Sequence, residues 1–395
     1  MDKNQNLKCR VYLKKGRDKS VRNYHPWIFS GAVQKVNGSF NPGDIVGVYS
    51  NEGQFLAKGF LNPGSQIRIR ILTFEDESID DQFLHNRLTQ ALQLRMHSPF
   101  LHTTAYRIIN GDGDYMPGLI VDCYNDILVM QIFSLGMHRL RRHLMTLLKS
   151  VFKPAAIVER SEGSALAEEG LSAENGIIYG ELPNKIIIQE NNIRYVVDVL
   201  NGQKTGFFLD QRDNRLRISA LAENKRLLNC FSYTGGFSVA AAQKGASTTS
   251  VDVSASALEI AKQNFSLNGL ESSKHEFVEM NAFNYFSGNK DVYEVIVLDP
   301  PAFIKKRSHL PRGARAYQEI NKQALQILEP EGILLSCSCS AHVSWELFQK
   351  ILFSAAKESG RKVRIIGKFS QPLDHPVNIY HPEGEYLKSF LLSVH

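Results

Sequence analysis

The sequence has no long apolar run. In its 395 residues we find no stretch of about 18 apolar residues, the length that spans a bilayer. The amino terminus, MDKNQNLKCR, is polar and lacks the apolar segment of a signal peptide. Internal repeats and low-complexity segments are absent as well. We therefore expect a cytoplasmic globular protein without a membrane-bound part, and the length predicts about two to three domains.

Cysteine is scarce, and its positions follow no metal-binding pattern. The five cysteines are an odd number and lie scattered along the chain without the spacing of metal ligands. This argues against a disulfide scaffold and against a zinc site, and it favours a reducing cytosol. We therefore expect no metal ion. The cysteines are Cys9, Cys123, Cys230, Cys337 and Cys339.

The net charge of +6 is mild, but the basic residues are unevenly distributed. Three basic clusters stand out along the chain. They predict a polyanionic partner, most simply nucleic acid, although any one cluster could instead be a solvated face. The clusters comprise Lys3, Lys8, Arg10, Lys14, Lys15, Arg17, Lys19 and Arg22; Arg139, Arg141 and Arg142; and Lys305, Lys306, Arg307, Arg312 and Arg315.

Residues 9–74 have the pattern of short strands. The segments GDIVGVYS and GQFLAKGFLNPGSQIRIRIL alternate apolar and polar residues and are punctuated by glycine or Asn-Pro. In the second segment, Ile67, Ile69 and Ile71 fall on one face of a strand, and Arg68 and Arg70 fall on the other. Several such strands in a short segment predict a small β-barrel.

Residues 80–190 predict an α+β middle domain, which follows an acidic linker over residues 75–81. We expect a helix in DESIDDQFLHNRLTQALQLRMHS, two strands around the turn in YRIINGDGDYMPGLIVDCYNDILVMQIF, an amphipathic helix in HRLRRHLMTLLKSVF and a strand in AAIVERSEG. The apolar residues of the first helix recur at nearly helical spacing; they are Phe83, Leu84, Leu88, Ala91 and Leu94.

Residues 191–395 predict an α/β domain. From Arg226 onward, expected strands and helices alternate. Strands separated by helices of about 10–15 residues indicate a parallel sheet with helical crossovers. Two consecutive strands, VRIIGKF and EYLKSFLLSV, close the chain, so one of them runs antiparallel to the rest. We therefore expect a doubly wound, mostly parallel sheet.

The stretch around which this domain is organised runs from Arg226 to Asp252. It predicts a strand, a turn at Thr234-Gly235-Gly236 that only small residues allow, a helix, and a second strand that ends in Asp252. A glycine turn between strand and helix leaves backbone N–H groups open to a ligand. A carboxylate at the end of the next strand is placed to hold a ribose. The unit therefore predicts an adenosine-containing cofactor, although such a turn also occurs by chance in α/β proteins.

Two further strand ends carry polar residues. Asn281 and Ala282 follow the third strand, at the end where such sheets bind ligands. The motif Asp299-Pro300-Pro301-Ala302-Phe303 follows the fourth strand. Two prolines make a stiff, non-helical loop that exposes carbonyl groups and Asp299 to a substrate. Because open α/β sheets bind ligands at the carboxyl ends of their strands, we expect these residues to share one site.

Several motifs together carry a family resemblance that covers nearly the whole chain. They are HPWIFSGAV, GDIV and GQFLAKGFLNP near the amino terminus, TGFFLDQR before the α/β domain, and Ser-Cys-Ser at Ser338-Cys339-Ser340. The chain resembles the PUA-domain 23S rRNA cytosine-5 methyltransferases. The resemblance implies a PUA-like, RNA-binding barrel over residues 9–74, an α+β domain over residues 80–190, and a Rossmann-like class I methyltransferase domain with a seven-stranded sheet over residues 191–395.

The sequence departs from the family pattern at two places. The middle domain has Asp112-Gly113-Asp114-Tyr115 where the family has Glu-x-Asp-Gly, and Tyr115 in place of glycine suggests an altered turn. Asn281 stands where the family usually shows an Asp that accepts a hydrogen bond from the adenine amine of the cofactor. The side-chain oxygen of Asn281 can accept that hydrogen bond equally.

The resemblance implies S-adenosylmethionine as the cofactor and a cysteine nucleophile at Cys339. Cytosine carbon 5 is a poor nucleophile, so a thiolate first adds to carbon 6. A free thiol is only a few per cent ionised at neutral pH, and His342 or the basic loop at residues 305–307 are candidates to promote its ionisation. Cys337 is more simply a small core residue. The base that removes the proton from carbon 5 is unassigned, with Asp299, Cys337 and water as candidates.

The expected site residues fall into three groups. The cofactor-binding group is Phe231, Tyr233, Thr234, Gly235, Gly236, Asp252, Val253, Asn281, Ala282 and Asp299, with Asp210, Gln211 and Arg212 as a flap, unless Asp210 merely caps a helix. The substrate-binding group is Pro300, Pro301, Phe303, Lys305 and Lys306, and the catalytic residues are Cys339 and Asp299.

These residues predict an S-adenosylmethionine-dependent RNA methyltransferase that forms 5-methylcytidine in 23S rRNA. The alternatives are a base N-methyltransferase acting on guanine or adenine of rRNA, and a catalytically inactive RNA-binding factor of ribosome assembly. A small-molecule methyltransferase would need neither a PUA-like domain nor a basic amino terminus. The expected partner is RNA, naked or in an assembling large subunit. The sequence decides neither the target nucleotide nor between a monomer and a homodimer.

Overall fold

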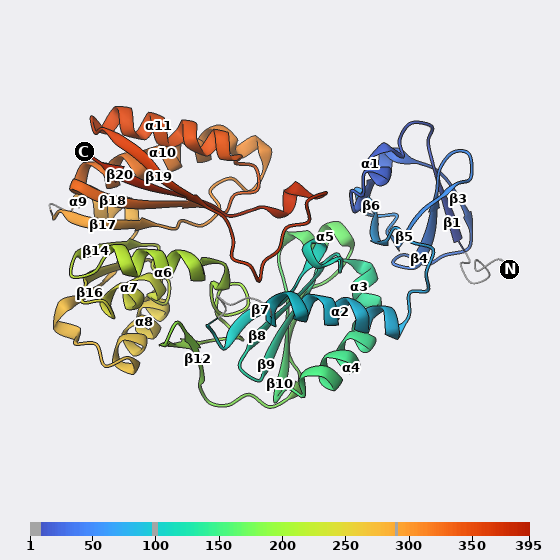
Figure 1. Cartoon of the computed structure of the whole chain (residues 1–395), viewed down its shortest axis with the longest axis horizontal. Coiled ribbons are helices and arrows are strands. Elements are labelled where there is room, and N and C mark those ends of the chain that lie inside the picture. The colour runs from blue at the N-terminus through green and yellow to red at the C-terminus, as the bar shows by residue number, and fades with distance from the viewer. Residues whose placement is uncertain (1–8, 97–101, 289–290) are drawn as a thin grey trace. The chain divides into compact units, whose positions relative to one another are not determined.

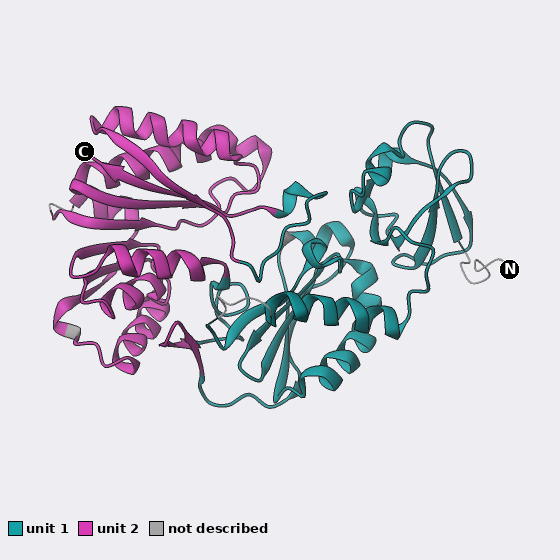
Figure 2. Ribbon diagram, viewed as in Figure 1, with its two compact units in different colours: residues 1–186, 197–209, 373–384 teal, residues 187–196, 210–372, 385–395 magenta. Residues whose placement is uncertain are grey.

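A computed structural model gives the structure of the chain, and it describes residues 9–96, 102–288 and 291–395. The chain forms two compact units (Figure 2). Unit 1 comprises residues 1–186, 197–209 and 373–384, and unit 2 comprises residues 187–196, 210–372 and 385–395. Each unit therefore contains segments that are far apart in the sequence.

The amino-terminal part of unit 1 is a six-stranded sheet in the order β2-β6-β5-β4-β1-β3 (Figure 1). Its core is made by the alternating apolar residues that the sequence pattern predicts, including Val11, Val48, Ile69 and Ile71. The elements are β1 (Cys9–Leu13), α1 (Lys19–Arg22), β2 (Trp27–Phe29), η1 (Ser30–Ala32), β3 (Val33–Gly38), β4 (Ile45–Tyr49), β5 (Phe55–Leu61) and β6 (Ile67–Thr73).

The second part of unit 1 is a five-stranded sheet in the order β11-β10-β9-β8-β7, and helices α2 and α4 contribute to its core. The elements are α2 (Asp81–Met96), β7 (Ala105–Asn110), η2 (Gly111–Asp114), β8 (Leu119–Tyr124), β9 (Ile127–Ile132), α3 (Leu135–Arg139), α4 (Arg141–Phe152), β10 (Ala156–Ser161), α5 (Ser164–Glu169) and β11 (Glu174–Gly180).

Several details of this part differ from the sequence prediction or go beyond it. The segment predicted as two strands forms three, because the chain turns tightly at Asn125, whose φ is 59°. Leu94 shares the helical spacing of the buried residues of α2 but is 50% exposed. The segment predicted as one amphipathic helix is divided at Leu140 into α3 and α4. Tyr115 has a φ of 57°, a left-handed conformation that glycine adopts without strain, so the turn is formed despite the larger side chain.

Unit 2 contains a seven-stranded sheet in the order β16-β15-β14-β17-β18-β20-β19. Strands β14 to β18 are mutually parallel, and β20 is antiparallel to both of its neighbours. The strands are β14 (Arg226–Cys230), β15 (Ser247–Asp252), β16 (His275–Glu279), β17 (Tyr293–Leu298), β18 (Leu328–Ser338), β19 (Val363–Phe369) and β20 (Lys388–Val394). The predicted parallel sheet with an antiparallel strand near its end is confirmed.

Helices cover both faces of this sheet (Figure 1). Alternate strand residues, such as Leu227 and Leu228, belong to different core clusters, so each face is packed separately. Helices α9, α10 and α11 pack on one face, and α6 and α7 pack on the other. The helices are η3 (Leu209–Gln211), α6 (Arg212–Leu221), α7 (Gly236–Ala242), α8 (Ala255–Leu267), η4 (Ser272–Lys274), α9 (Ala282–Gly288), η5 (Arg307–His309), α10 (Leu310–Ile327), α11 (Trp345–Ser359) and η6 (Pro382–Gly384), and a separate two-stranded sheet joins β12 (Ile186–Glu190) and β13 (Ile193–Val197).

Unit 1 contains buried ion pairs. The Arg95 guanidinium donates to both carboxylate oxygens of Asp114, at 2.6 and 2.7 Å. Arg107 donates in the same way to Asp122, at 2.7 and 3.0 Å. All four side chains are buried, and such pairs are stable only when both partners are present. The Asp-rich turn at residues 112–115 therefore has a structural role.

Candidate active site

The carboxyl ends of the parallel strands of unit 2 form one edge of the sheet. Cys230, at the end of β14, is in register with Val251 of β15 and Leu298 of β17, and Leu298 is in register with Ser336 of β18. The loops that leave these strands therefore lie beside one another. We call their residues the strand-end edge: 231–236, 252–253, 281–282, 299–303 and 339–340. The expected site residues of these loops are thus brought together.

The loop after β14 holds an uncommon backbone conformation. Phe231, Tyr233 and Gly235 have φ values of 60°, 48° and 74°, all in the left-handed region. Such a conformation costs about 1–3 kcal/mol for a residue with a large side chain, and it concentrates at functional sites. The prediction that only small residues allow this turn holds at Gly235, where an added Cβ would lie 3.0 Å from the Cβ of Ala261. Phe231 and Tyr233 precede the predicted turn and adopt the left-handed region despite their large side chains, and Gly236 begins α7.

Asp252 is fixed by two backbone hydrogen bonds. Its Oδ2 atom accepts from the N–H of Tyr233 at 2.8 Å, and its Oδ1 atom accepts from the N–H of Ser254 at 2.9 Å. Each carboxylate oxygen keeps a second lone pair, so Asp252 can still accept hydrogen bonds from a pair of ribose hydroxyl groups. The neighbouring Val253 is 65% exposed and offers an apolar surface beside this carboxylate.

Asn281 and Ala282 follow β16 and lie in different environments. Asn281 is exposed, and its Oδ1 atom accepts a hydrogen bond from the N–H of Phe283 at 2.9 Å, which begins the turn into α9. The side chain of Ala282 is buried in the core of unit 2. A cofactor contact at Ala282 would therefore use its backbone, whereas Asn281 could use its side chain.

The expected flap residues are buried within unit 2. Asp210, Gln211 and Arg212 lie in the turn η3 and at the start of α6. The hydroxyl group of Tyr386 donates to Asp210 Oδ2 at 2.8 Å. The alternative that Asp210 caps the helix is wrong, because Gln211 occupies the capping position of α6. Gln211 Oε1 instead accepts from Asn214 Nδ2 at 2.7 Å.

Cys339 lies beside the Asp-Pro-Pro loop. Its Sγ atom is 3.9 Å from the carbonyl oxygen of Pro300, and it is half-buried, whereas the other four cysteines are buried. Cys337 has a different environment: its thiol donates to Ser389 Oγ at 3.3 Å, and burial raises its pKa well above the usual range. The two cysteines do not share a strand face, because β18 ends at Ser338. Cys337 is therefore a core residue, and Cys339 alone is accessible.

An aromatic cluster adjoins the Asp-Pro-Pro loop. Phe303 is at its centre, with ring centroids 6.3 Å from Phe231, 6.2 Å from Phe283 and 4.7 Å from Tyr317. The sequence analysis identified Phe231 and Phe303 but missed the other two. Their only signal in the sequence is an aromatic residue within a helix, which is common in ordinary cores.

Two polar residues near Cys339 were also missed. Lys388, the first residue of β20, is buried, and its Nζ atom donates to the carbonyl oxygen of Ser340 at 3.0 Å. The hydroxyl group of Tyr317 contacts the Oγ atoms of Ser338 and Ser340, both at 3.0 Å. A lysine at the start of the apolar strand KSFLLSV is the one feature that could have drawn attention to Lys388.

The strand-end edge has a polar group that suits a ligand. Ser232 is buried in the strained loop after β14, and no described residue forms a hydrogen bond with its Oγ atom. Buried hydroxyl groups normally have a partner. This free hydroxyl, the fixed Asp252 carboxylate and the exposed Val253 together fit a ligand with a polar part and an apolar part. S-adenosylmethionine meets this description.

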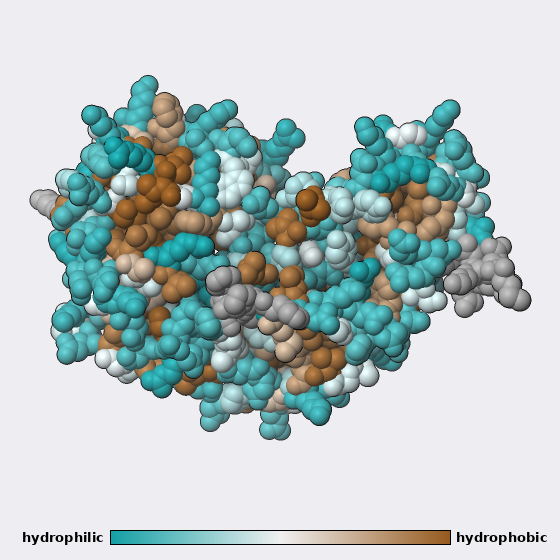
Figure 3. Space-filling view, in the orientation of Figure 1, coloured by the Kyte–Doolittle hydropathy of each residue, from teal (hydrophilic) through white to brown (hydrophobic). Residues whose placement is uncertain are grey.

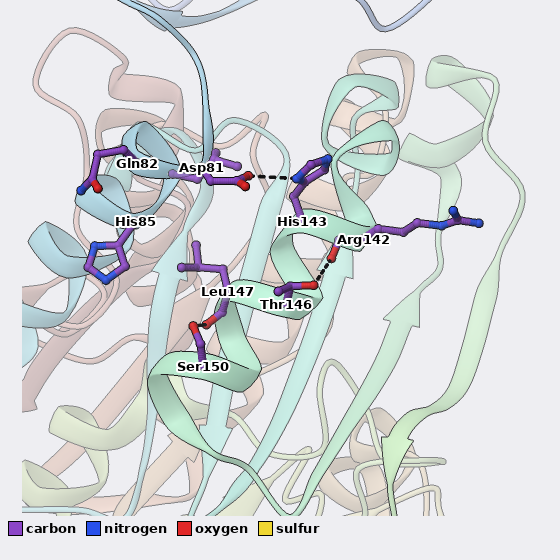
Figure 4. A pocket seen from close by; sticks show the side chains of 9 residues that line it. Asp81, Gln82, His85, Arg142, His143, Thr146, Leu147 and Ser150 are labelled. Atoms are coloured by element: carbon purple, nitrogen blue, oxygen red, sulfur yellow. Dashed lines mark hydrogen bonds and ion pairs between the residues drawn. The ribbon is translucent and has the colours of Figure 1, made fainter.

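A pocket of about 420 Å³ lies in unit 1, between α2 and α4 (Figure 4). Asp81 and His143 meet across it at 2.9 Å, and both side chains are largely exposed. None of the expected site residues lines this pocket. Its lining residues are Asp81, Gln82, Leu84, His85, Arg142, His143, Thr146, Leu147 and Ser150.

The three basic clusters differ in how far their charges are compensated. Arg139 pairs with Asp44 at 3.0 Å, and Arg141 pairs with Glu159 at 2.7 Å and with Glu174 at 3.1 Å. Most of the second cluster is therefore neutralised within unit 1. The basic residues of the third cluster are all exposed. Those of the first cluster that the structure describes are exposed as well, and Lys3 and Lys8 lie outside the described residues.

Several features of the described residues bear on the class of protein. Across residues 9–96, 102–288 and 291–395, no helix has the length and apolarity needed to cross a membrane. Over the same ranges, no group of three or more His, Cys, Asp or Glu side chains is arranged to hold a metal ion. The face seen in Figure 3 is mostly hydrophilic, with apolar residues in separate patches.

Comparison with known proteins agrees with this geometry. Residues 11–74 match the PUA-like domain, and residues 137–378 match the S-adenosylmethionine-dependent methyltransferases. The ribosomal RNA large subunit methyltransferase I of Tolumonas auensis is 44% identical over 390 residues, which cover 97% of this chain and 98% of that protein.

Two solved structures have the same fold over nearly their whole length. A candidate S-adenosylmethionine-dependent methyltransferase from Streptococcus mutans has 26% identity and a TM-score of 0.82, covering 97% of this chain and 99% of that one. A candidate methyltransferase complexed with SAH has 25% identity and a TM-score of 0.84, with the same coverage. The chain thus belongs to the S-adenosylmethionine-dependent methyltransferases that carry an amino-terminal PUA-like domain.

Proposed function

We propose that this enzyme methylates carbon 5 of a cytosine in 23S rRNA, with Cys339 as the nucleophile. The observation that carries the proposal is the position of the Cys339 thiol, half-buried and 3.9 Å from the Pro300 carbonyl oxygen at the strand-end edge. The name of the Tolumonas auensis relative, a ribosomal RNA large subunit methyltransferase, supports large-subunit rRNA as the substrate. The PUA-like domain supports an RNA partner.

Carbon 5 of cytosine becomes reactive only after a nucleophile has added to carbon 6. In the proposed reaction, the Cys339 thiolate forms a bond to carbon 6, and the electron pair of the 5,6 double bond moves to make carbon 5 nucleophilic. Carbon 5 then takes up a methyl group. Loss of the carbon-5 proton to a base returns an electron pair to the ring and breaks the bond between sulfur and carbon 6.

S-adenosylmethionine, when bound, supplies an electrophilic methyl group and leaves as S-adenosylhomocysteine. Asp252 would hold its ribose, the loop at residues 231–236 would surround its methionine part, and Val253 and Asn281 would contact its adenine. Gly236, Ala282 and the flap residues Asp210, Gln211 and Arg212 complete the proposed set. The free hydroxyl group of Ser232 is a further candidate for the polar part of the cofactor.

The Asp-Pro-Pro loop would receive the cytosine. Pro300 and Pro301 keep this loop rigid, and Phe303 offers an aromatic face on which a base can stack. Lys305 and Lys306 are exposed and available for phosphate groups. A cytosine in folded RNA must leave its stack to reach such a site.

The proton on carbon 5 would be removed by Asp299 or by a water molecule that Asp299 orients. Cys337 is the weaker candidate, because it is fully buried and its thiol already donates to Ser389. Asp299 precedes Pro300 directly, so it lies on the same loop as the carbonyl group beside Cys339.

The proposal extends to the organisation of the chain and its location. We assign RNA binding to residues 9–74, an α+β middle domain to residues 80–190 and catalysis to residues 191–395. We place the enzyme in the cytoplasm, where free cysteines stay reduced. Naked 23S rRNA and an assembling large subunit are both candidate substrates, and oligomeric state, including a homodimer, is a separate measurement.

The test is methylation of unmodified 23S rRNA with tritiated S-adenosylmethionine, followed by nucleoside analysis. We compare the wild type with Cys339→Ala and with Cys337→Ala as the matched control. We expect label in 5-methylcytidine that Cys339→Ala loses by on the order of 1000-fold or more, because a nucleophile is removed. Cys337→Ala should keep most of the activity, since it removes only a buried sulfur atom.

Other outcomes would point elsewhere. Label in a methylated guanine or adenine, with Cys339→Ala still active, would replace the proposal by an N-methyltransferase. Absence of label from naked RNA would call for the same assay on an immature large subunit. Absence there too would favour an RNA-binding assembly factor.

A further inference from the structure

Lys388 is a buried lysine beside the proposed nucleophile. It begins β20 and is in register with Ser338, the last residue of β18. The next residue after Ser338 is Cys339, and the Nζ atom of Lys388 donates to the carbonyl oxygen of Ser340 at 3.0 Å. The ammonium group is therefore held against the segment that contains the thiol, although Lys388 itself is only 3% exposed.

A buried ammonium group calls for an anionic partner. Burying an unpaired charge is costly, and buried lysines are normally paired with a carboxylate. Among the residues that the structure describes, no carboxylate lies within ion-pair distance of Lys388, and Ser340 is its one hydrogen-bond acceptor. A negative charge on Cys339 or on Glu385 favours the charged form of Lys388.

Lys388 is a buried cation among the charged and titratable groups of this region. The charged and titratable groups around Cys337, Cys339 and Lys388 come from the loop after β17, from α10, from β18 and from residues 385–388; they are Asp299, Tyr317, Cys337, Glu385 and Lys388. Burial lowers the pKa of Lys388, and a negative charge on Cys339 or on Glu385 opposes that change. Burial raises the pKa of Tyr317, so its phenol stays neutral.

The cations that the sequence suggested for stabilising the Cys339 thiolate lie in positions less suited to that role. His342 and the basic residues of the loop at 305–307 are all exposed. Water and salt weaken the effect of an exposed charge on a neighbouring group, whereas a buried charge acts in a lower dielectric.

We propose that Lys388 is a positioning residue whose buried ammonium group stabilises the thiolate form of Cys339. The use of that thiolate in catalysis rests on the proposed function, but its stabilisation does not. The ammonium group compensates the charge of the sulfur atom, and its hydrogen bond to Ser340 fixes the backbone that carries the thiol. The cysteine is thereby prepared for attack before any RNA binds.

The test is the pH dependence of alkylation of Cys339 by iodoacetamide in the folded protein, read by peptide mass spectrometry. Cys339 is half-buried and the other four cysteines are buried, so those four serve as internal controls for folding. The variants are Lys388→Met, Lys388→Arg and, as a matched control, Lys368→Met. Lys368 lies in the neighbouring strand β19, is exposed, and has the same charge.

We expect the midpoint of the alkylation profile to rise by about one pH unit or more in Lys388→Met, the shift that loss of a nearby opposite charge causes. That shift is a tenfold loss of thiolate at neutral pH. Lys388→Arg and Lys368→Met should keep the wild-type midpoint. An unchanged or lower midpoint in Lys388→Met overturns the proposal. A rise in Lys388→Arg equal to that in Lys388→Met does so as well, since the charge would then not be the cause.

The result is separable from the outcome for the proposed function. Methylation by Lys388→Met should fall about tenfold at pH 7 and recover toward the wild-type rate near pH 9, where the thiol ionises without help. If Cys339→Ala still methylates RNA while Lys388→Met shifts the alkylation midpoint, the proposed nucleophile is wrong and the stabilised thiolate remains. If Cys339→Ala is inactive and the alkylation midpoint does not move in Lys388→Met, the proposed nucleophile stands and the proposed role of Lys388 is wrong.

Discussion

The ion pairs of unit 1 and the strand-end edge of unit 2 handle buried polar groups in opposite ways. Arg95 and Asp114 satisfy each other with two hydrogen bonds, and so do Arg107 and Asp122. At the strand-end edge, the hydroxyl group of Ser232 has no partner among the described residues. Beside that edge, the ammonium group of Lys388 has no carboxylate within ion-pair distance among the same residues.

The difference distinguishes polar groups that stabilise the fold from polar groups that are available to a ligand. A completed network stabilises one arrangement and leaves nothing to offer a ligand. An incomplete one costs stability and is retained where a ligand or a reaction completes it. Three predictions test this comparison.

The largest expected effect is on the completed network. Arg95→Met leaves the Asp114 carboxylate buried without its partner, and we expect the free energy of unfolding of unit 1 to fall by about 3–5 kcal/mol. Unit 1 and unit 2 each contain one of the two tryptophans, Trp27 and Trp345. In a Trp345→Phe background, Trp27 fluorescence during urea unfolding therefore reports on unit 1 alone.

The companion variant is Arg95→Met with Asp114→Asn. It removes the unpaired charge and should recover part of the lost stability. An Arg95→Met protein as stable as the wild type would mean that this network does not hold unit 1 together.

A smaller effect is expected at the strand-end edge. Asp252→Asn keeps the shape of the side chain but removes the charge that would accept hydrogen bonds from the ribose. We expect the affinity for S-adenosylhomocysteine, measured by calorimetry, to fall by about 10- to 100-fold, the value of one or two hydrogen bonds to a charged group. The control is Glu259→Gln on α8, an exposed residue with the same change of charge. Equal affinities in both variants would remove Asp252 from the cofactor site.

The smallest effect concerns charges at the surface. Lys305→Met combined with Lys306→Met removes two exposed charges, so RNA affinity should weaken and its dependence on log salt should drop by about one per lysine. Arg139→Met removes a charge that Asp44 already compensates and should leave that slope unchanged. Filter binding of a 23S rRNA fragment at several salt concentrations measures both. A larger effect of Arg139→Met would reverse our assignment of the RNA-binding charges.

Much of unit 2 could be predicted from the sequence, because its signals are local and periodic. Short apolar runs such as LLNCF and VIVLDPP, separated by helical segments, indicate buried strands of a parallel sheet. Parallel pairing then places Asp252, Asp299 and Cys339 at one edge without any further information. The middle domain was predicted less well, since its second and third strands are separated only by a tight turn at Asn125.

What the sequence could not show depends on contacts between distant segments. Lys388 approaches Cys339 because β20 inserts antiparallel beside β18, a pairing that no local pattern encodes. The left-handed conformations of Phe231 and Tyr233 contradict their own residue preferences, and only the surrounding structure imposes them. The ion pair of Arg95 with Asp114 likewise joins two separate segments, the helix α2 and the turn η2.

The segment at residues 373–384 has a consequence for the order in which the protein is made. It belongs to unit 1, where the Asp374 carbonyl oxygen accepts from Arg95 at 2.8 Å, Asp374 Oδ2 accepts from the N–H of Arg107 at 2.9 Å, and the Pro376 carbonyl oxygen accepts from Asn110 at 2.9 Å. A domain built from an unbroken stretch of chain can fold as it leaves the ribosome. Unit 1 cannot finish until residue 384 has been synthesised, although it contains the first residues to emerge, and unit 2 needs the still later residues 385–395.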